Sequence, residues 1–232
     1  MKYVLAALVA SVSFVGTANA IPAYLDPRAD PTLILSWENP GGDHAHHCTG
    51  FYIGNGMIVT AAHCVYDTEG KKGFWNYPYE VFDRMGNYYG HTIDVLFVDV
   101  RHDMAVISDE RATDTGIRPA AVSCALPPEG TVIRVAGYPE FLWYQENYGV
   151  VKQSSWDEVV SNLWPSHVSH TALQRHGNSG GPVFNAETNE VVGIVVGGVE
   201  IDGVHLDEVM VPTATLCTEF LNQVVAENKG HK

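Results

Sequence analysis

The sequence predicts an all-β protein built from two antiparallel six-stranded β-barrels, and three observations lead to this prediction. Short runs rich in Val, Ile, Thr and Tyr recur along the chain, as is typical of β-strands. Gly, Pro, Asn and Asp lie between these runs and mark turns. The runs form two sets, separated by residues 109–128, a stretch rich in Pro, Thr, Asp and Ala that is typical of a linker. We therefore expect two barrels packed side by side.

The first set of runs predicts a barrel within residues 32–115, and the second set predicts a barrel within residues 116–228 that ends in a helix. In this C-terminal helix, apolar residues recur every four positions from Leu216, and Thr213 is the predicted N-cap. The predicted strands cover residues 32–37, 49–53, 57–60, 79–83, 91–98 and 104–108 in the first barrel, and 131–137, 148–153, 168–173, 182–185, 191–196 and 208–211 in the second.

The N-terminus has the three parts of a secretory signal peptide. Lys2 precedes an apolar run over residues 3–15, and Ala18-Asn19-Ala20 is a small-residue cleavage site. A run of about 13 residues is too short to span a bilayer, which takes roughly 20. We therefore expect residues 1–20 to be removed, residues 21–31 to form a short N-terminal segment, and the mature protein to be secreted.

The charge of the chain excludes two classes of partner. The sequence has 27 acidic residues and 13 basic ones, with a formal net charge of −14 at pH 7. Nucleic acids and anionic membranes attract basic surfaces, so we expect neither as a partner. The same net charge favours the solubility of an exported protein. We also expect the protein to be a monomer.

Three short segments carry the chemistry. They are Thr60–Cys64 (TAAHC), Arg101–Ala105 (RHDMA) and Gly177–Pro182 (GNSGGP). A serine hydroxyl is a weak nucleophile unless an imidazole takes its proton, and a carboxylate orients that imidazole and stabilises its charged form. His63, Asp103 and Ser179 of these segments could fill the three roles, and they occur in the order His, Asp, Ser.

A competing interpretation places the same serine on the nucleophile elbow of an α/β-hydrolase, because residues 177–181 also fit Gly-x-Ser-x-Gly. That fold places its acid and its histidine after the serine. Only 53 residues follow Ser179, which leaves little room for further strand and helix units. The order of the segments favours the two-barrel fold.

In these segments the chain resembles the trypsin/chymotrypsin-like serine proteases, especially the short bacterial secreted members and the glutamyl endopeptidases, which also carry Asn before the serine. The resemblance implies a chymotrypsin-like fold with the active site between the barrels. It implies that His63 is the base, Asp103 the carboxylate and Ser179 the nucleophile of a serine endopeptidase that acts on a peptide or protein substrate. The backbone N–H groups of Gly177 and Ser179 are the candidate oxyanion hole.

A catalytically silent protease-like binding protein or adhesin is the alternative function. Proteins of that class usually lose a member of the triad, whereas this sequence retains all three residue types. The presence of His63, Asp103 and Ser179 therefore favours the enzyme. Esterase or lipase activity would require the acid and the histidine to follow the serine.

The four cysteines of an exported chain favour two disulfides, for which three pairings are possible. The family resemblance implies that Cys48 pairs with Cys64, which leaves Cys124 to pair with Cys217. Histidines crowd before Cys48, at positions 44, 46 and 47, and suggest zinc, but a disulfide would consume the cysteine. We expect neither a metal nor another cofactor.

The substrate-binding residues are less well defined. The resemblance places Leu173 where trypsin-like enzymes have an aspartate, and Val195 follows Gly193-Ile194 where glutamyl endopeptidases have a histidine. An apolar or small residue before the scissile bond is our preferred prediction, and Glu and Lys/Arg stay open. The candidate substrate-binding residues are Leu173, Gln174, Val196, Gly197 and Gly198, and further possible lining residues are His170, Thr171, His176, Glu200, Asp202 and His205.

The residue before the serine bears on how the protease is activated. In the pancreatic enzymes, an aspartate before the serine pairs with the new N-terminus after zymogen cleavage, whereas this chain has the uncharged Asn178 there. Signal cleavage after Ala20 would expose Ile21. We predict a site that forms without zymogen processing and is held by hydrogen bonds from the Asn178 amide.

Overall fold

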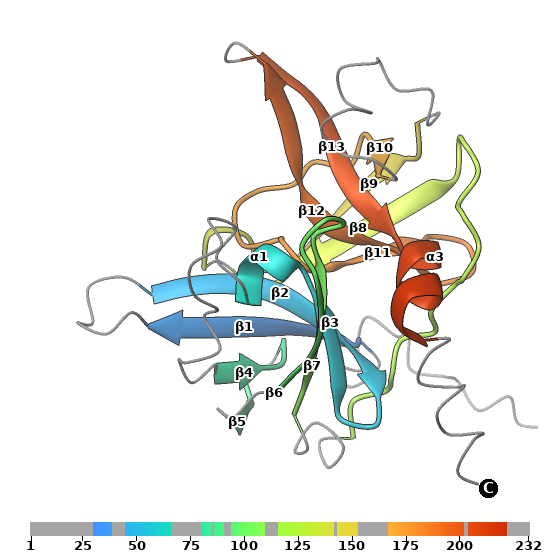
Figure 1. Cartoon of the computed structure of the whole chain (residues 1–232). Helices are drawn as coiled ribbons and strands as arrows, with labels where there is room; N and C mark the ends of the chain where they lie inside the picture. Colours follow the sequence, from blue (N-terminus) through green and yellow to red (C-terminus); the bar gives the residue numbers. More distant parts are fainter. Residues whose placement is uncertain are drawn as a thin grey trace, which may run out of the picture.

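The strands of this protein form two antiparallel sheets that lie side by side (Figure 1). The structure is a computed structural model, and it describes residues 30–38, 45–65, 80–84, 86–90, 94–109, 116–141, 143–152, 167–201 and 204–221. Side chains at 38, 45, 46, 88–90, 141, 199–201 and 204–206 are outside this description. The predicted signal peptide also lies outside it. The all-β class with two antiparallel sheets is confirmed.

The first sheet has seven strands in the order β5-β4-β1-β2-β3-β7-β6. Six strands were predicted here, and the additional one is β5, which pairs with β4. A tight turn makes this hairpin, in which the Asp83 carboxylate accepts the backbone N–H of Asn87 at 2.9 Å. The strands are β1 (Thr32–Glu38), β2 (Ala45–Gly54), β3 (Met57–Thr60), β4 (Glu80–Phe82), β5 (Tyr88–Gly90), β6 (Asp94–Asp99) and β7 (Met104–Ser108).

The second sheet has the six predicted strands, in the order β10-β13-β12-β11-β8-β9. Two of them are longer than predicted, because β12 continues beyond Val196 and its Gly197 and Gly198 pair with Val209 and Glu208. The result is a long β12–β13 hairpin, visible in orange and red at the top of Figure 1. The strands are β8 (Val132–Gly137), β9 (Gln145–Val150), β10 (Val168–His170), β11 (Pro182–Asn185), β12 (Val191–Ile201) and β13 (Val204–Pro212).

Apolar side chains fill each sheet and the space between the sheets. Fully buried Leu35 and Ile58 belong to the core of the first sheet. A central cluster joins the two sheets, with Val106 on β7 and Ile194 on β12 among its members. Burying one such side chain is worth roughly 1.5–3 kcal/mol, so the shared cluster holds the two sheets in a fixed relation.

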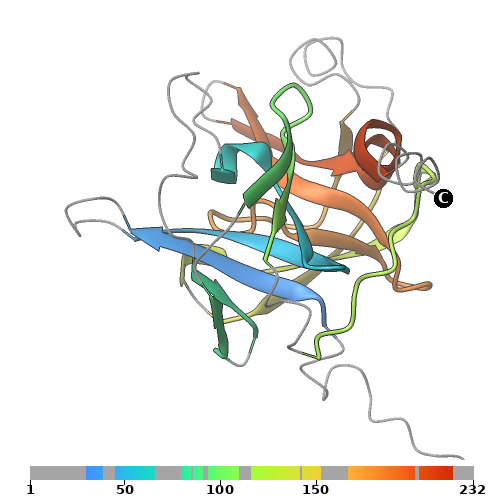
Figure 2. The ribbon, with the colours of Figure 1, turned by 60° about the horizontal axis from the view of Figure 1, so that its bottom comes forward.

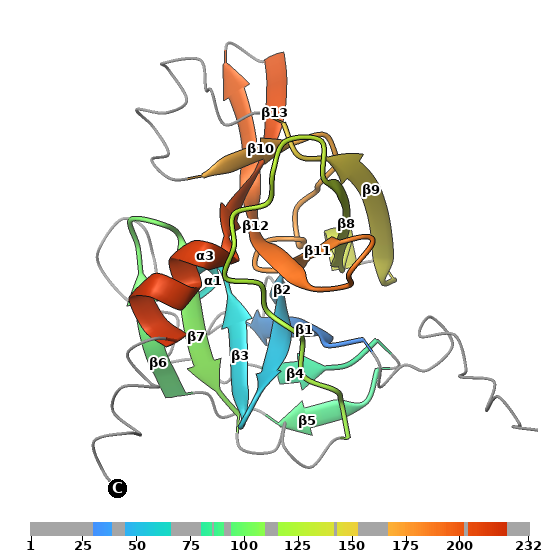
Figure 3. The same ribbon diagram turned by 90° about the vertical axis from the view of Figure 1, so that its right-hand side faces the viewer.

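The segment over residues 116–131 connects the two sheets, and Figure 3 shows it in yellow-green running from one to the other. The Ala120 N–H donates to the Tyr52 carbonyl of β2 at 2.8 Å, and the Ser123 N–H donates to the Val191 carbonyl of β12 at 2.9 Å. The connection is therefore bonded to both sheets.

The C-terminal helical segment comprises α3 (Thr213–Leu216) and a π-helical turn, η6 (Cys217–Leu221), and it lies beside the second sheet (Figure 2). The prediction that Thr213 caps this helix is wrong. Pro212 is the N-cap residue, and the Thr213 hydroxyl lies 2.6 Å from the Ser123 carbonyl instead. The expected apolar stripe is seen at Leu216 and Phe220, which are buried. In the described ranges, no helix has the length and apolar character needed to cross a membrane.

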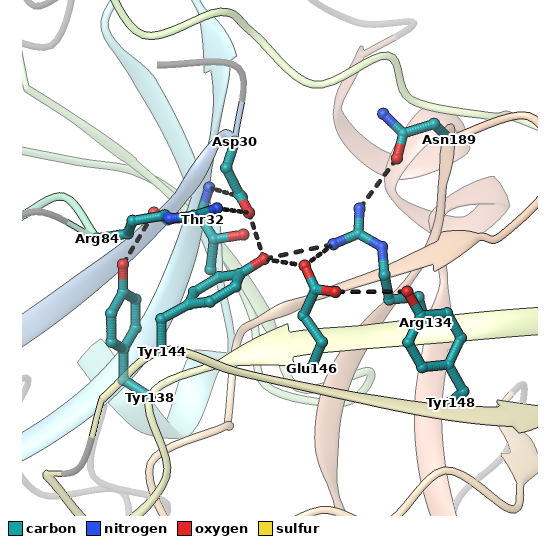
Figure 4. Close-up of polar contacts among 9 residues, drawn as sticks. All are labelled: Asp30, Thr32, Arg84, Arg134, Tyr138, Tyr144, Glu146, Tyr148 and Asn189. Atoms are coloured by element: carbon teal, nitrogen blue, oxygen red, sulfur yellow. Dashed lines mark hydrogen bonds and ion pairs between the residues drawn. The ribbon is translucent and has the colours of Figure 1, made fainter. Parts of the chain in front are cut away.

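A polar network also ties the start of β1 to the second sheet (Figure 4). The Tyr144 hydroxyl lies between two carboxylates, Asp30 and Glu146, and hydrogen-bonds to both. Arg134 on β8 forms an ion pair with Glu146 at 2.7 Å, and Asp30 accepts the Thr32 N–H at 2.9 Å. Burial, followed by the two carboxylates, raises the pKa of Tyr144, so this hydroxyl stays a proton donor at all physiological pH values.

Candidate active site

His63 lies on α1 (Ala62–Val65), a single helical turn directly after β3. Two anchors fix this turn. The Thr60 hydroxyl donates to the Thr49 carbonyl of β2 at 2.9 Å, and Cys64 forms a disulfide with Cys48, also on β2. These anchors hold the backbone at His63 in place. The His63 side chain is 30% exposed, so its ring stays accessible.

Asp103 lies in the turn before β7, and its side chain is 10% exposed. One carboxylate oxygen is 2.7 Å from His63 Nδ1, and the other accepts the backbone N–H of His63 at 2.8 Å. This pairing places the imidazole proton on Nδ1 and leaves Nε2 free to accept one. Asp103 has a φ of +55°, a conformation that costs about 1–3 kcal/mol in a residue other than glycine and is common at functional sites.

Ser179 lies in the loop between β10 and β11, and backbone hydrogen bonds from both sheets hold this loop. Its carbonyl accepts the Thr49 N–H of β2 at 2.8 Å. The next residue, Gly180, donates its N–H to the Val195 carbonyl of β12 at 2.7 Å, and Val195 donates back to Gly181 at 2.9 Å. The position of the serine therefore depends on both sheets.

Gly177 occupies a position that only glycine fits. Its φ is +97°, and a Cβ there would lie 2.0 Å from His47 Nε2. The Thr49 hydroxyl donates to the Gly177 carbonyl at 2.7 Å and accepts the Tyr138 N–H at 3.1 Å. The N–H groups of Gly177 and Ser179 donate to no other described residue, so both are available to a ligand.

His63 and Ser179 line one cavity of about 600 Å³. No hydrogen bond joins their side chains within the described part of the chain. Such a bond is often long or poorly aligned before substrate binds, so its absence does not argue against a nucleophile and base pair. The other lining residues are Glu140, Gln174, Arg175, His176, Val195, Val196, Gly197, Gly198 and Glu208.

Most of the predicted substrate-binding residues lie on the walls of this cavity. Gln174, Val196, Gly197 and Gly198 line it, as does His176. One predicted residue is elsewhere: Leu173 is 52% exposed and is not part of the lining. Two further possibilities also lie outside the lining, because His170 is fully buried and Thr171 is exposed, and the side chains of Glu200, Asp202 and His205 lie outside the described residues.

Sequence reasoning missed four of the lining residues: Glu140, Arg175, Val195 and Glu208. Arg175 and Glu140 approach each other to 3.7 Å, and both side chains are about half exposed. Glu208 is 5% exposed. The sequence did contain an indication that Glu208 is unusual, because it is the one acidic residue in a predicted strand that continues as Val-Met-Val.

The expected hydrogen bonds from the Asn178 amide are not formed among the described residues. Asn178 is buried, and its Oδ1 has no hydrogen-bond partner there. The backbone holds the loop instead, because the Asn178 N–H donates to the Arg175 carbonyl at 3.0 Å and the Gly181 N–H donates to the Asn178 carbonyl at 2.9 Å.

The cysteines form the disulfides Cys48–Cys64 and Cys124–Cys217. Ligand atoms of Cys48, His63 and Cys64 lie within 4.8 Å of one another, which is close enough for a metal ion. The disulfide removes both thiolates, however, so this group cannot bind zinc as cysteine-rich sites do. Within the described residues, His47 Nε2 lies 2.9 Å from the Tyr138 carbonyl, whereas His44 and the His46 side chain lie outside them.

A larger cavity, of about 780 Å³, lies elsewhere, and neither His63 nor Ser179 lines it. Its walls include His102 and Lys152. Size alone would favour this cavity as a binding site. The chemistry favours the smaller one, because it contains the paired imidazole and the serine hydroxyl.

Comparisons with known proteins identify the family and the fold. Residues 48–194 match the profile of a family described as the trypsin-like peptidase domain. No curated protein matches the chain. Similar solved structures include the serine endoprotease from Yersinia pestis, with 18% identity, a TM-score of 0.64, and coverage of 87% of this chain and 65% of that one.

Two further structures are similar. The Rv3671c protease from M. tuberculosis, in its active form, has 17% identity, a TM-score of 0.62, and coverage of 85% of this chain and 83% of that one. The HtrA-type protease AlgW with a tripeptide has 17% identity, a TM-score of 0.66, and coverage of 87% and 63%. This chain thus covers just under two thirds of the Yersinia and HtrA-type proteins, and at these identities the likeness shows a shared fold.

Proposed function

Because the chain belongs to the trypsin-like peptidase family, we propose that it is a secreted serine endopeptidase that uses His63, Asp103 and Ser179. The observation that carries the proposal is the His63–Asp103 pair, in which the carboxylate holds both the ring and the backbone of the histidine. Ser179 lines the same cavity as His63, and its hydroxyl is the one that His63 would activate.

In the proposed reaction, His63 Nε2 takes the hydroxyl proton as Ser179 Oγ attacks the carbonyl carbon of the substrate. The resulting tetrahedral oxyanion collapses, the peptide C–N bond breaks, and the imidazolium returns the proton to the leaving amine. The acyl group stays on Ser179 as an ester. Water then attacks this ester with His63 again as the base, which releases the acid and regenerates the hydroxyl.

The oxyanion requires donors that are already in place. The N–H groups of Gly177 and Ser179 are the proposed donors, since neither is used by another described residue. Removing one donor of this kind costs roughly 3–4 kcal/mol in comparable enzymes. Asp103 is proposed to keep the proton on Nδ1 of His63 and to stabilise the imidazolium.

The test is digestion of a peptide library by the folded, disulfide-bonded protein. We expect internal cleavage by the wild type and none by Ser179→Ala. Ser108→Ala is the matched control, because this serine on β7 lies outside the cavity and, among the described residues, its hydroxyl hydrogen-bonds to the Asp94 carbonyl alone. Binding of library peptides without cleavage would overturn the proposal and favour a protease-like binding protein.

Secretion and the monomeric state are parts of the same proposal. We expect the exported protein to begin at Ile21, which N-terminal sequencing of culture supernatant would identify, and to sediment as a monomer. An intact N-terminus on the exported protein would contradict cleavage after Ala20.

A further inference from the structure

A single threonine of the first sheet contacts both loops beside the serine. Thr49 on β2 is fully buried, and its hydroxyl donates to the Gly177 carbonyl at 2.7 Å and accepts the Tyr138 N–H at 3.1 Å. Its main-chain N–H donates to the Ser179 carbonyl at 2.8 Å, and its own carbonyl accepts the Thr60 hydroxyl at 2.9 Å. Thr49 therefore contacts the backbone of the proposed nucleophile, the proposed oxyanion-hole glycine and the residue before the turn that carries the base.

The direction of each oxyanion-hole N–H is set by the carbonyl of the same peptide group. A peptide group is planar and trans, so its N–H and its C=O point in opposite directions. The Gly177 N–H shares a peptide group with the His176 carbonyl, which accepts the Glu140 N–H at 2.7 Å. The Ser179 N–H shares one with the Asn178 carbonyl, which accepts a backbone N–H of the same loop at 2.9 Å. Each donor thus points away from the group that holds its carbonyl.

The peptide group between these two is held by a side chain. Gly177 has a φ of +97°, and the absence of a Cβ allows this residue many other backbone conformations. A rotation at Gly177 would turn the peptide groups on either side of it, and with them the Gly177 N–H. The Thr49 hydroxyl opposes such a rotation, because it donates to the Gly177 carbonyl.

The same hydroxyl also holds the loop that orients the His176 carbonyl. Tyr138, whose N–H it accepts, lies two residues before Glu140. Glu140 has a φ of +53°, a strained conformation that persists in a residue other than glycine only where its surroundings hold it. Both peptide groups that flank Gly177 are therefore tied to Thr49, one directly and the other through this loop.

We propose that Thr49 is a positioning residue of the catalytic site, whose hydroxyl keeps the Gly177 N–H directed at the oxyanion before substrate binds. Thr49 does not line the cavity, so it acts through Gly177 and not on the substrate. It takes the part that we expected of the Asn178 amide, whose Oδ1 bonds to no described residue. The proposal rests on the serine endopeptidase function proposed above.

The first test compares peptide cleavage by variants of two buried threonines. Thr49→Val replaces the hydroxyl by a methyl group, Thr49→Ala removes it without placing a methyl against the Gly177 carbonyl, and Thr49→Ser retains it. Thr213→Val is the matched control. Thr213 is also fully buried, its hydroxyl lies 2.6 Å from the Ser123 carbonyl and 3.1 Å from the Val191 carbonyl, and it does not line the catalytic cavity.

We expect Thr49→Val and Thr49→Ala to lower kcat at least about 30-fold and to leave KM within about 3-fold, since loss of one oxyanion donor costs about 10²–10³ in kcat. Thr49→Ser and Thr213→Val should keep kcat within about 3-fold of the wild-type value, although Thr213→Val also loses buried hydrogen bonds and stability. An unchanged kcat in the folded Thr49→Ala or Thr49→Val protein, an equal loss in Thr213→Val, or no recovery in Thr49→Ser would overturn the proposal.

The second test separates this proposal from the proposed function, because it needs no turnover. Amide hydrogen exchange is measured without substrate at the Asn178 and Gly181 N–H groups, which are hydrogen-bonded within the serine loop. We expect exchange at least about 10-fold faster in Thr49→Ala than in the wild type, and an unchanged rate at these amides in Thr213→Val.

The two tests together distinguish the two failures. Faster exchange in Thr49→Ala, with no peptide cleavage by the wild type, would refute the endopeptidase and retain Thr49 as the residue that holds the loop. Cleavage by the wild type, with exchange and kcat unchanged in Thr49→Ala, would refute the role of Thr49 and retain the endopeptidase.

Discussion

Two histidine–aspartate pairs lie close together in this protein, and their geometries are nearly the same. In one, Asp103 contacts His63 Nδ1 at 2.7 Å and the His63 N–H at 2.8 Å. In the other, Asp99 at the end of β6 contacts His102 Nδ1 at 2.5 Å and the His102 N–H at 3.1 Å. Each carboxylate therefore fixes both the ring and the backbone of its histidine.

The surroundings of the two imidazoles differ. The His63 side chain is 30% exposed and shares a cavity with Ser179, whereas the His102 side chain is 12% exposed and lines the larger cavity, which Ser179 does not line. Asp99 is also local, three residues before its histidine, and Asp103 is 40 residues from His63. A carboxylate-bound imidazole is therefore a candidate catalytic base only where a nucleophile shares its cavity.

Removing each imidazole gives the largest expected difference between the pairs. His63→Ala should lower kcat/KM for the best peptide by about 10⁶-fold, as loss of the base does in a comparable triad. His102→Ala should change it by less than about 5-fold, because no step of the proposed reaction uses that ring. Comparable losses of kcat/KM in the two variants would contradict the assignment of His63, and not His102, as the base.

Neutralising each carboxylate is the next test. Asp103→Asn should lower kcat by about 10⁴-fold, since an amide at this position favours the wrong tautomer of His63. Asp99→Asn should leave kcat within about 5-fold. The variants remove the same charge at neighbouring positions, so steady-state kinetics on both separates a catalytic role from a general electrostatic one. A large loss in Asp99→Asn would mean that the two pairs act together.

A third histidine, His170, is fully buried, and its ring lies 2.7 Å from the Gln174 side chain. Burial lowers the pKa of His170 from 6.5 to about 4, and the folded protein therefore resists its protonation. Above pH 6.5 this imidazole is uncharged in both the folded and the unfolded chain, so its burial costs no stability. As the pH falls from 6.5 toward 4, the unfolded chain takes up the proton and the folded chain does not, so the free energy of unfolding decreases. From pH 7 to pH 4.5 we expect this residue to account for about 2–3 kcal/mol of lost stability.

Urea unfolding at both pH values, compared between the wild type and His170→Gln, measures this contribution. The variant retains an acceptor for the Gln174 amide, which lies 2.7 Å from the His170 ring. Equal losses of stability in the two proteins between pH 7 and pH 4.5 would show that His170 is not the group responsible.

The smallest expected effect concerns the stability supplied by the Asp99 pair. Burial acts to raise the pKa of Asp99, but the hydrogen bonds and charge of His102 outweigh it and lower that pKa. The stabilisation is therefore present above the ordinary carboxyl range and is lost as the pH falls below it. Asp99→Asn should lower the free energy of unfolding at pH 7 by up to about 1 kcal/mol, and by less at pH 3. An equal loss at both pH values would contradict this assignment.

Local patterns made part of the fold and site predictable. The strand predicted over residues 182–185 matches β11, because Gly-Gly-Pro before it and Asn after it define both ends. The segment around His63 was recognisable because the residues that shape its turn are adjacent in sequence. Family resemblance also gave the pairing of Cys48 with Cys64.

The remainder depends on long-range contacts that no local pattern encodes. The strand predicted over residues 191–196 ends before Gly197 and Gly198, yet pairing with β13 extends it through both glycines. This register brings Glu208 to the cavity, ten residues beyond its partner Gly198. Thr213 resembles a helix cap, but its hydroxyl contacts carbonyls of residues distant in sequence. In each case, contacts with residues distant in sequence determine the local structure.

The most direct measurement is labelling of the folded protein with a fluorophosphonate, followed by identification of the modified residue by mass spectrometry. We predict an adduct on Ser179 in the wild type, loss of that adduct in His63→Ala, and labelling of His102→Ala at the wild-type rate. An unmodified Ser179 in the folded, disulfide-bonded wild type, or an adduct that forms equally fast without His63, would contradict this prediction.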